Sequence, residues 1–236
     1  MLVAAALCPC PPLLVPEVAA GAAPELDVLR AACLDAVGVL AAARPDRLVV
    51  LGPTDEAGRG AYPQGATGTF RGFGVDLHVR LGAFGPAPER DLPPSLSVGA
   101  WLLSRTDWAD APVEGLGVTE SLTGDRCRAL GRELAASAPR LALLVMGDGS
   151  ARRSLKAPGY FDERAADFDA AAARALGAAD LAALAALDEE LAADLLVSGR
   201  SCWQVLAGAA EGAGLRGQLL REEAPYGVGY VAAAWT

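Results

Sequence analysis

The sequence predicts an α/β fold, a three-layer α/β/α domain whose central sheet is mostly parallel, with mixed pairing left open at the C-terminal end. Two observations lead to this prediction. Short apolar runs that fit buried strands alternate with longer segments of helical spacing, an order typical of a parallel sheet covered by helices. No linker, repeat or low-complexity segment divides the 236 residues, so we expect a single domain over residues 1–236.

The N-terminal part begins with two predicted strands and one helix. Residues 2–7 are apolar and stop at the prolines of CPCPP, and residues 47–51 (RLVVL) form a second apolar run. Residues 24–43 between them form the helix. Its apolar stripe consists of Leu26, Leu29, Cys33, Val37 and Leu40. The segment GPTDEAGRGAYPQGATG that follows the second strand is too long for a plain turn.

The remaining elements continue the alternation up to two final strands. We expect one or two strands in residues 69–81 with a kink at RGFG, a proline-rich connection at 85–94, a helix at 96–105, a weak strand at 112–118, a helix from SLTGD to Ser137, and a strand at 141–146. Thr123 and Asp125 are the candidate N-caps of the second of these helices.

The C-terminal part is mostly helical. Residues 162–211 have helical spacing, broken near Gly177, Asp188 and Ser198-Gly199, and two strands flank Pro225. The aromatic residues expected in the core are Phe161, Phe168, Trp203, Tyr230 and Trp235.

Charge and cysteine content limit the partners and the compartment. The net charge of −9 argues against nucleic acid and anionic membranes, which both need a basic surface. No apolar stretch is long enough to span a membrane, and the N-terminus lacks the basic start of a signal peptide. The five cysteines are odd in number and form no disulfide framework, which predicts reduced thiols in a cytoplasmic protein.

Unusual sequence follows three of the predicted strands. These segments are PCPP at residues 9–12, GPTDE at 52–56 and GDGSARR at 147–153. Because ligands of open α/β sheets bind beyond the carboxyl ends of the strands, we expect the three segments to line one crevice. The residues expected to line it are Cys8, Cys10, Pro53, Thr54, Asp55, Glu56, Gly149 and Ala151.

Four motifs in order resemble one protein family. They are CPCPPLLVPEV, ARPDRLVVLGP, GDGSARR followed by APGYFDERAADFDAA, and PYGVGYVAAAW. The chain resembles, over nearly its whole length, the class III extradiol ring-cleavage dioxygenases, in the branch associated with Memo-like proteins. The resemblance implies a single α/β domain with a non-haem Fe(II) site. In that site two histidines and a glutamate bind iron, and another histidine is the acid/base in catechol ring cleavage.

The sequence departs from this family at the positions that carry the chemistry. Cys10 stands at the first iron histidine, Thr54 of the Pro53-Thr54 dipeptide at the second, and Ala151 at the acid/base histidine. The carboxylate ligand is expected in the late helical region, but no Asp, Glu or His lies between Asp194 and Glu211.

The histidine count leads to the same expectation without any alignment. The single histidine, His78, lies in an alternating strand pattern that predicts a solvent-facing side chain. A two-histidine iron site therefore cannot be built within one chain. We expect no cofactor, although the resemblance implies Fe(II).

Several residues remain candidates for other chemistry. Cys10 could bind a softer metal with Cys8 and Asp55 or Glu56, could act as a nucleophile if Arg152 lowers its pKa, or could be a buried thiol. Asp55 and Glu56 fit either an acid/base pair or a solvated loop. The GDGS segment, with Asp148, Ser150, Arg152 and Arg153, fits either an anion site or a simple turn.

Three hypotheses of function follow. The first is a divergent dioxygenase-like protein, without ring cleavage, whose cleft binds a small molecule or a partner. The second is an enzyme with a rebuilt site that uses Cys10, Asp55, Glu56, Asp148 or Ser150. The third is a structural or interaction protein, which predicts a filled cleft and an exposed apolar patch. Sequence leaves the partner protein open, and a homo-oligomer is one alternative.

Overall fold

The chain folds around a seven-stranded mixed sheet with the strand order β3-β6-β2-β7-β1-β9-β8. A computed structural model describes residues 1–85 and 90–236, so part of the proline-rich connection lies outside the described residues. The parallel strands are β1 (Leu2–Cys8), β2 (Arg47–Pro53), β6 (Val113–Val118) and β7 (Leu141–Met146). The antiparallel strands are β3 (Gly60–Tyr62), β8 (Gly217–Glu223) and β9 (Tyr230–Trp235).

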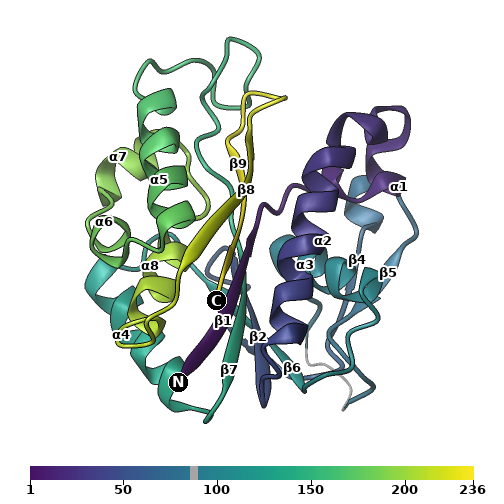
Figure 1. Cartoon of the computed structure of the whole chain (residues 1–236). Helices are drawn as coiled ribbons and strands as arrows, with labels where there is room; N and C mark the ends of the chain where they lie inside the picture. The colour runs from purple at the N-terminus through teal and green to yellow at the C-terminus, as the bar shows by residue number, and fades with distance from the viewer. Residues whose placement is uncertain (86–89) are drawn as a thin grey trace.

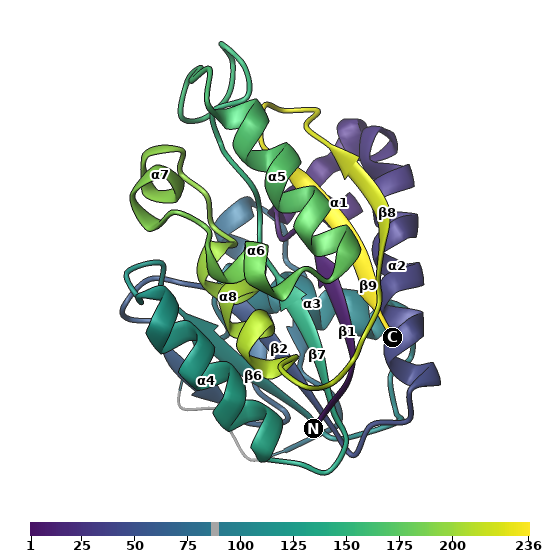
Figure 2. The same ribbon diagram turned by 60° about the vertical axis from the view of Figure 1, so that its left-hand side comes forward.

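Helices cover both faces of this sheet, which confirms the predicted three-layer α/β/α fold (Figure 1). One face carries α2 (Asp27–Ala42) and α3 (Pro94–Arg105). The other face carries α4 (Gly124–Ala136), α5 (Ala165–Ala178) and α8 (Arg200–Ala209), which lie in front of the sheet in Figure 2. The short helices are α1 (Pro16–Ala19), α6 (Leu181–Ala185) and α7 (Glu189–Asp194).

The sequence of the central strands explains why both faces are covered. Every residue of β7, LALLVM, is buried, and β1 contributes Ala4, Ala6 and Cys8 to the core under α2 and α3. Its alternate residues Ala5 and Leu7 belong to the core under α5 and α8. Successive side chains of a strand point to opposite faces, so a continuous apolar run is stable only between two layers.

The crossover connections leave an opening at the carboxyl ends of the central strands. The helices that follow β1 and β2 lie on one face, whereas those that follow β6 and β7 lie on the other. The chain therefore leaves the adjacent strands β1 and β7 toward opposite faces. Such a topological switch point leaves a crevice beyond the carboxyl ends of the strands.

Some elements differ from the sequence prediction in extent. Helix α2 begins at Asp27 rather than residue 24, because Pro24 lies in a 3₁₀ segment that covers Ala20–Leu26. The glycine-rich segment after β2 contains β3 and β4 (Thr67–Thr69), and β4 pairs with β5 (His78–Arg80) in a two-stranded sheet. The expected kink at RGFG is a 3₁₀ turn that ends at Gly74, whose φ of 83° favours glycine.

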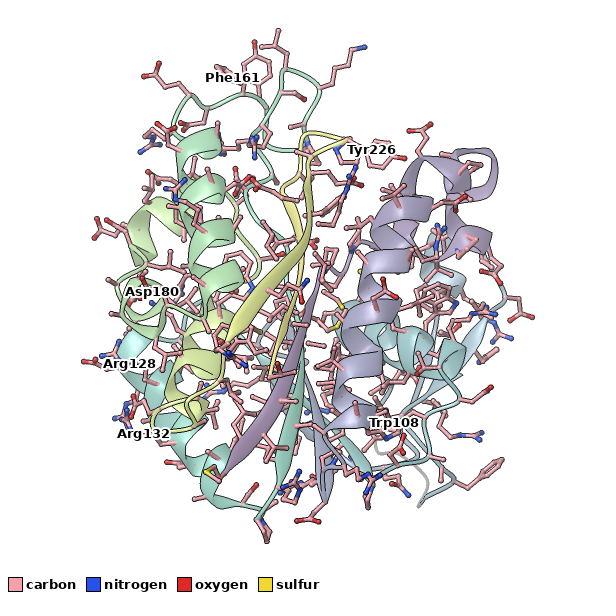
Figure 3. The ribbon with its side chains drawn as sticks, in the orientation of Figure 1. Trp108, Arg128, Arg132, Phe161, Asp180 and Tyr226 are labelled. Atoms are coloured by element: carbon pink, nitrogen blue, oxygen red, sulfur yellow. The ribbon has the colours of Figure 1, made fainter. Side chains whose placement is uncertain are left out.

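One prediction about a single residue is wrong, and another is confirmed for the position but not for the hydrogen bond. Phe161, expected in the core, is 49% exposed in the loop before α5, at the outer end of the molecule (Figure 3). Thr123, one of the two candidates, occupies the N-cap position of α4, but its side chain accepts no capping hydrogen bond. Glu189 Oε1 accepts the hydrogen bond from the Gly124 amide at 2.7 Å instead.

Other expectations for single residues are confirmed. Phe168, Trp203, Tyr230 and Trp235 are buried. The His78 side chain is 58% exposed on β5. Within residues 1–85 and 90–236, no helix has the length and apolarity needed to cross a membrane.

Candidate functional site

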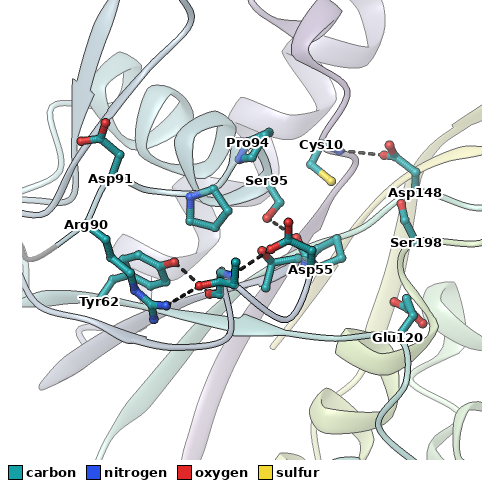
Figure 4. A pocket seen from close by; sticks show the side chains of 15 residues that line it. Cys10, Asp55, Tyr62, Arg90, Asp91, Pro94, Ser95, Glu120, Asp148 and Ser198 are labelled. Atoms are coloured by element: carbon teal, nitrogen blue, oxygen red, sulfur yellow. Dashed lines mark hydrogen bonds between the residues drawn. The ribbon is translucent and has the colours of Figure 1, made fainter. Parts of the chain in front are cut away.

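A cavity of about 620 Å³ lies at the carboxyl ends of β1, β2, β6 and β7. Its volume falls in the range of roughly 300–1,000 Å³ that is usual for small-molecule sites. Figure 4 shows most of the side chains that line it. The lining residues are Cys10, Pro53, Thr54, Asp55, Ala57, Gly58, Tyr62, Arg90, Asp91, Pro93, Pro94, Ser95, Glu120, Asp148 and Ser198.

Cys10 and Asp148 join the ends of β1 and β7 at the inner wall. The Cys10 amide donates to Asp148 Oδ1 at 2.7 Å, which connects the two loops that diverge toward opposite faces. Burial raises the pKa of the Asp148 carboxyl to about 7, although hydrogen bonds from Cys10 partly oppose this rise. Asp148 therefore exchanges its proton near neutral pH.

The Cys10 side chain is a neutral thiol. It is 7% exposed, and burial raises its pKa well above the usual value, with Asp148 as the next cause. Both metal binding and nucleophilic attack need the thiolate, which requires a lowered pKa. The surroundings of Cys10 thus favour the buried-thiol interpretation over the other two.

Glu120 is a second carboxyl of the inner wall that sequence reasoning missed. It follows β6 and accepts from Ser201 Oγ at 2.8 Å and from the Ser201 amide at 3.2 Å, while Arg200 Nε lies 3.4 Å from Oε2. Burial raises its pKa, and Ser201 and Arg200 partly offset this effect. The strand-end rule, that ligands bind beyond the carboxyl ends of parallel strands, also applies to β6. The segment TES at residues 119–121 could therefore have been predicted to line the cavity.

The opposite part of the cavity is built around Tyr62 and Arg90. The Arg90 guanidinium lies 4.3 Å from the centre of the Tyr62 ring and donates to the carbonyls of Ala57 and Arg59, each at 2.8 Å. Tyr62 Oη donates to the Gly58 carbonyl at 2.8 Å. These bonds hold the glycine-rich segment in place and leave an aromatic and cationic wall at this end (Figure 4).

Asp55 and Ser95 lie between the two ends. Asp55 Oδ1 accepts from the Gly58 amide at 2.8 Å, and Ser95 Oγ donates to the Pro53 carbonyl at 2.6 Å. The proline ring of Pro53, with Pro93 and Pro94, supplies apolar surface nearby.

Four of the eight predicted crevice residues lie outside the cavity lining: Cys8, Glu56, Gly149 and Ala151. Cys8 is buried and its thiol donates to the Cys33 carbonyl at 3.8 Å. Glu56 is exposed and accepts from Ser121 Oγ at 2.9 Å. The structure therefore does not bring Cys8 and Glu56 together with Cys10 in the cavity.

The GDGS segment turns away from the cavity after Asp148. The amide of Gly149 donates to Gly229 O at 2.7 Å, that of Ser150 to Asp169 Oδ1 at 2.7 Å, and that of Ala151 to Leu195 O at 3.0 Å. Ser150 Oγ donates to Leu195 O at 3.1 Å and accepts from the Arg152 amide at 3.1 Å.

Arg153 completes this network with an ion pair of 2.9 Å to the buried Asp169. The amides that an external anion would need are thus already used inside the protein. The geometry favours the turn interpretation of GDGS, and none of Gly149, Ser150, Ala151 or Arg152 lines the cavity.

The residues present do not fit the Fe(II) centre that the family resemblance implies. In the part of the chain that the structure describes, no three His, Cys, Asp or Glu side chains are grouped so that they could hold a metal ion. Cys10 is a protonated thiol and Thr54 offers a neutral hydroxyl. His78 lies on β5 beside Asp76, at 3.2 Å, and is not part of the cavity lining.

The fold and this site define an α/β protein with a ligand-sized cavity at its strand ends. No protein-family model matches the chain, and no curated protein matches its sequence. A solved structure, the crystal structure of the uncharacterized protein JW3007 from Escherichia coli K12, is similar over 99% of this chain and 99% of its own. The TM-score is 0.60 and the sequence identity 18%, so the likeness shows the fold alone.

Proposed function

We propose that the chain is a divergent class III extradiol dioxygenase-like protein that binds a small molecule in its cavity and does not cleave rings. The observation that carries the proposal is the cavity of about 620 Å³, open at the strand ends and lined by Cys10 and Thr54. By the resemblance, those two positions hold the iron histidines of the family. A cavity of ligand size with a few polar groups is the usual form of a binding site.

A second candidate is an acid/base enzyme with a rebuilt site. The specific observation in its favour is Asp148, whose pKa of about 7 is suited to proton transfer at neutral pH. Shifted pKa values also occur in purely structural networks, so binding remains the first proposal. The pure interaction protein has less support, because it predicts a filled cleft.

The proposal also includes the compartment of the protein and its partner. All five cysteines are free and buried, which fits a reducing compartment, and we place the protein in the cytoplasm. The partner in this proposal is a small molecule. The acidic net charge of −9 gives nucleic acid no matching surface.

Metal content and iron-dependent activity test the loss of ring cleavage. Untagged protein, purified without added metal, should contain no stoichiometric iron, and added Fe(II) should leave both the Tm and the catechol concentration unchanged. Cys10→Ser and Cys127→Ser form a matched pair, since Cys127 is buried on α4 away from the cavity. Stoichiometric metal that is lost only in Cys10→Ser would contradict the proposal.

A thermal-shift screen with small molecules tests binding in the cavity. We expect hits whose stabilisation disappears in Ser198→Phe, which fills the cavity, and persists in Ala166→Phe at an exposed position on α5. If a hit is instead consumed, and Asp148→Asn abolishes its turnover without weakening its binding, the acid/base enzyme replaces the binding protein as the better proposal.

A further inference from the structure

Negatively charged side chains outnumber positively charged ones in the cavity lining. Among the described residues, four carboxyl groups line it, from Asp55, Asp91, Glu120 and Asp148, against the single guanidinium of Arg90. Arg90 lies at the Tyr62 end and already donates to two backbone carbonyls. The inner wall, where Cys10, Ser198, Glu120 and Asp148 lie along one side in Figure 4, contains acidic groups but no basic residue of the described lining.

The carboxyl groups of Glu120 and Asp148 differ in how the protein stabilises their negative charge. Glu120 has Arg200 at 3.4 Å and two hydrogen bonds from Ser201, and the Arg200 side chain is only 3% exposed. Asp148 receives hydrogen bonds from Cys10 alone and forms no ion pair with the described residues. A desolvated carboxylate without a cation is unfavourable, and the cost falls when a cation approaches from the cavity.

The rest of the lining is suited to an apolar body. Pro53, Pro93, Pro94 and Ala57 contribute aliphatic surface, and Tyr62 contributes an aromatic ring. Of these residues, Pro94 and Tyr62 lie on the side of the cavity away from Asp148 and Glu120 (Figure 4). Asp55, Asp91 and Arg90 also line this part, so it carries charge of both signs beside its apolar groups, whereas the inner wall is acidic only. This arrangement favours a molecule with a cationic end and an apolar body.

We infer that the ligand of this cavity is an organic cation, a protonated amine on a small apolar or aromatic body. The ammonium group binds at Asp148 and Glu120, with the Ser198 hydroxyl as a further acceptor, and the body packs against the prolines and Tyr62. Charge-assisted hydrogen bonds between an ammonium and a carboxylate are stronger than hydrogen bonds between neutral groups. An anionic ligand of the same shape meets repulsion at the same wall. This inference rests on the proposed binding function and adds the class of ligand.

Three probes that share one body and differ only in end charge test the inference. They are 2-phenylethylamine, 2-phenylethanol and phenylacetate, each titrated to tens of millimolar into the full chain at pH 8. At this pH the Asp148 carboxyl, with a pKa of about 7, is mostly ionised. Two-dimensional NMR of the backbone amides gives both the dissociation constant and the location of binding. We expect the amine to bind at least tenfold more tightly than the alcohol, with shifts at Cys10, Asp148 and Ser198.

Matched substitutions distinguish the effect of the inner wall on amine binding from the effect of the overall net charge. Asp148→Asn and Glu120→Gln should each reduce the preference for the amine at least fivefold. Asp35→Asn and Glu133→Gln remove one charge each at exposed positions on α2 and α4 and should leave it unchanged. Preservation of the amide spectrum in each variant shows that the fold is intact.

The two proposals fail in different ways. If the alcohol or the acid shifts the cavity amides as strongly as the amine, the cation inference is overturned while ligand binding stands. If none of the three probes shifts the cavity amides, both are overturned.

Discussion

The buried carboxyl of Asp148 at the cavity wall makes the stability of the folded chain depend on pH. Its pKa of about 7 in the folded chain lies above the usual 3.8 of an aspartate, because burial disfavours the charged form. Folding therefore takes up a proton between about pH 4 and pH 7. The contribution of Asp148 to stability is fully present below pH 4 and is lost as the pH rises through 7.

Replacement of this carboxyl by an amide should stabilise the protein at alkaline pH. Asp148→Asn keeps an oxygen to accept from the Cys10 amide and removes the buried charge. At pH 8 we expect its free energy of unfolding to exceed that of the wild type by on the order of 2–4 kcal/mol, with little difference near pH 4. Urea denaturation at both pH values measures this, with Asp35→Asn as the exposed control. An equal effect at both pH values would refute the assignment.

Sequence reasoning reached part of the cavity and missed the rest for a physical reason. The strand-end rule led to Cys10, Thr54, Asp55 and Asp148, all of which line the cavity. It requires only that a parallel strand be recognised. Tyr62 and Arg90 lie in segments without periodicity, and their place in the cavity depends on the path of the glycine-rich loop. That path is set by tertiary contacts, which no local pattern encodes.

At the scale of elements, the crossing of α4 and α8 positions the acidic wall. The two helices approach so closely that a Cβ added at Gly131 would lie 2.0 Å from the Val205 carbonyl oxygen, and one at Gly208 would lie 2.2 Å from that of Arg128. The crossing holds the start of α8 against the segment after β6. Arg200 and Ser201 thereby reach Glu120 and fix its carboxylate.

A methyl group at this crossing should separate the helices. Gly131→Ala meets backbone atoms that cannot move aside, so we expect a loss of about 1–3 kcal/mol in unfolding free energy. Gly38→Ala on α2 is the matched control, because nothing lies within 4 Å of its added Cβ. There the better helix propensity of alanine should stabilise the chain by about 0.5–1 kcal/mol. Denaturant titration measures both, and similar effects at the two sites would contradict the packing argument.

Element length decided which elements could be predicted. The apolar runs of β1, β2 and β7 and the stripe of α2 extend over enough residues to show a period. The strands β3 and β4 have three residues each, too few for a pattern. β5, also of three residues, was expected only within the wider alternating stretch of residues 69–81. The N-cap position of α4 at Thr123 could be predicted, but its side-chain acceptor could not, since Glu189 comes from a different helix.

For the whole molecule, the order of the strands sets a gradient of stability across the sheet. β7 pairs with β1 on one side and β2 on the other, and all of its residues are buried. β8 is an edge strand whose residues include exposed Gln218, Arg221 and Glu222. Opening of β7 therefore requires loss of both core clusters, whereas β8 can separate alone.

Hydrogen exchange should follow this gradient. We expect the β7 amides of residues 143–145 to exchange only through global unfolding, and those of β8 to exchange orders of magnitude faster through local opening. Exchange measured by NMR in low concentrations of denaturant distinguishes the two routes. If β8 amides show the same protection as β7, the sheet opens as a single unit and the gradient does not exist.

The burial of all five free thiols has a consequence for work with the protein in solution. Burial raises the pKa of Cys127 to about 11, and the thiols of Cys10 and Cys202 also have raised values. In the native chain a thiol-specific reagent can therefore reach only Cys10, 7% exposed at the cavity wall, and the raised pKa of this thiol slows the reaction. Unfolding exposes the other four thiols together, so the mass of the labelled protein records the fraction of molecules that have unfolded at least once. The native cysteines thus report the rate of unfolding, and no residue has to be engineered for this measurement.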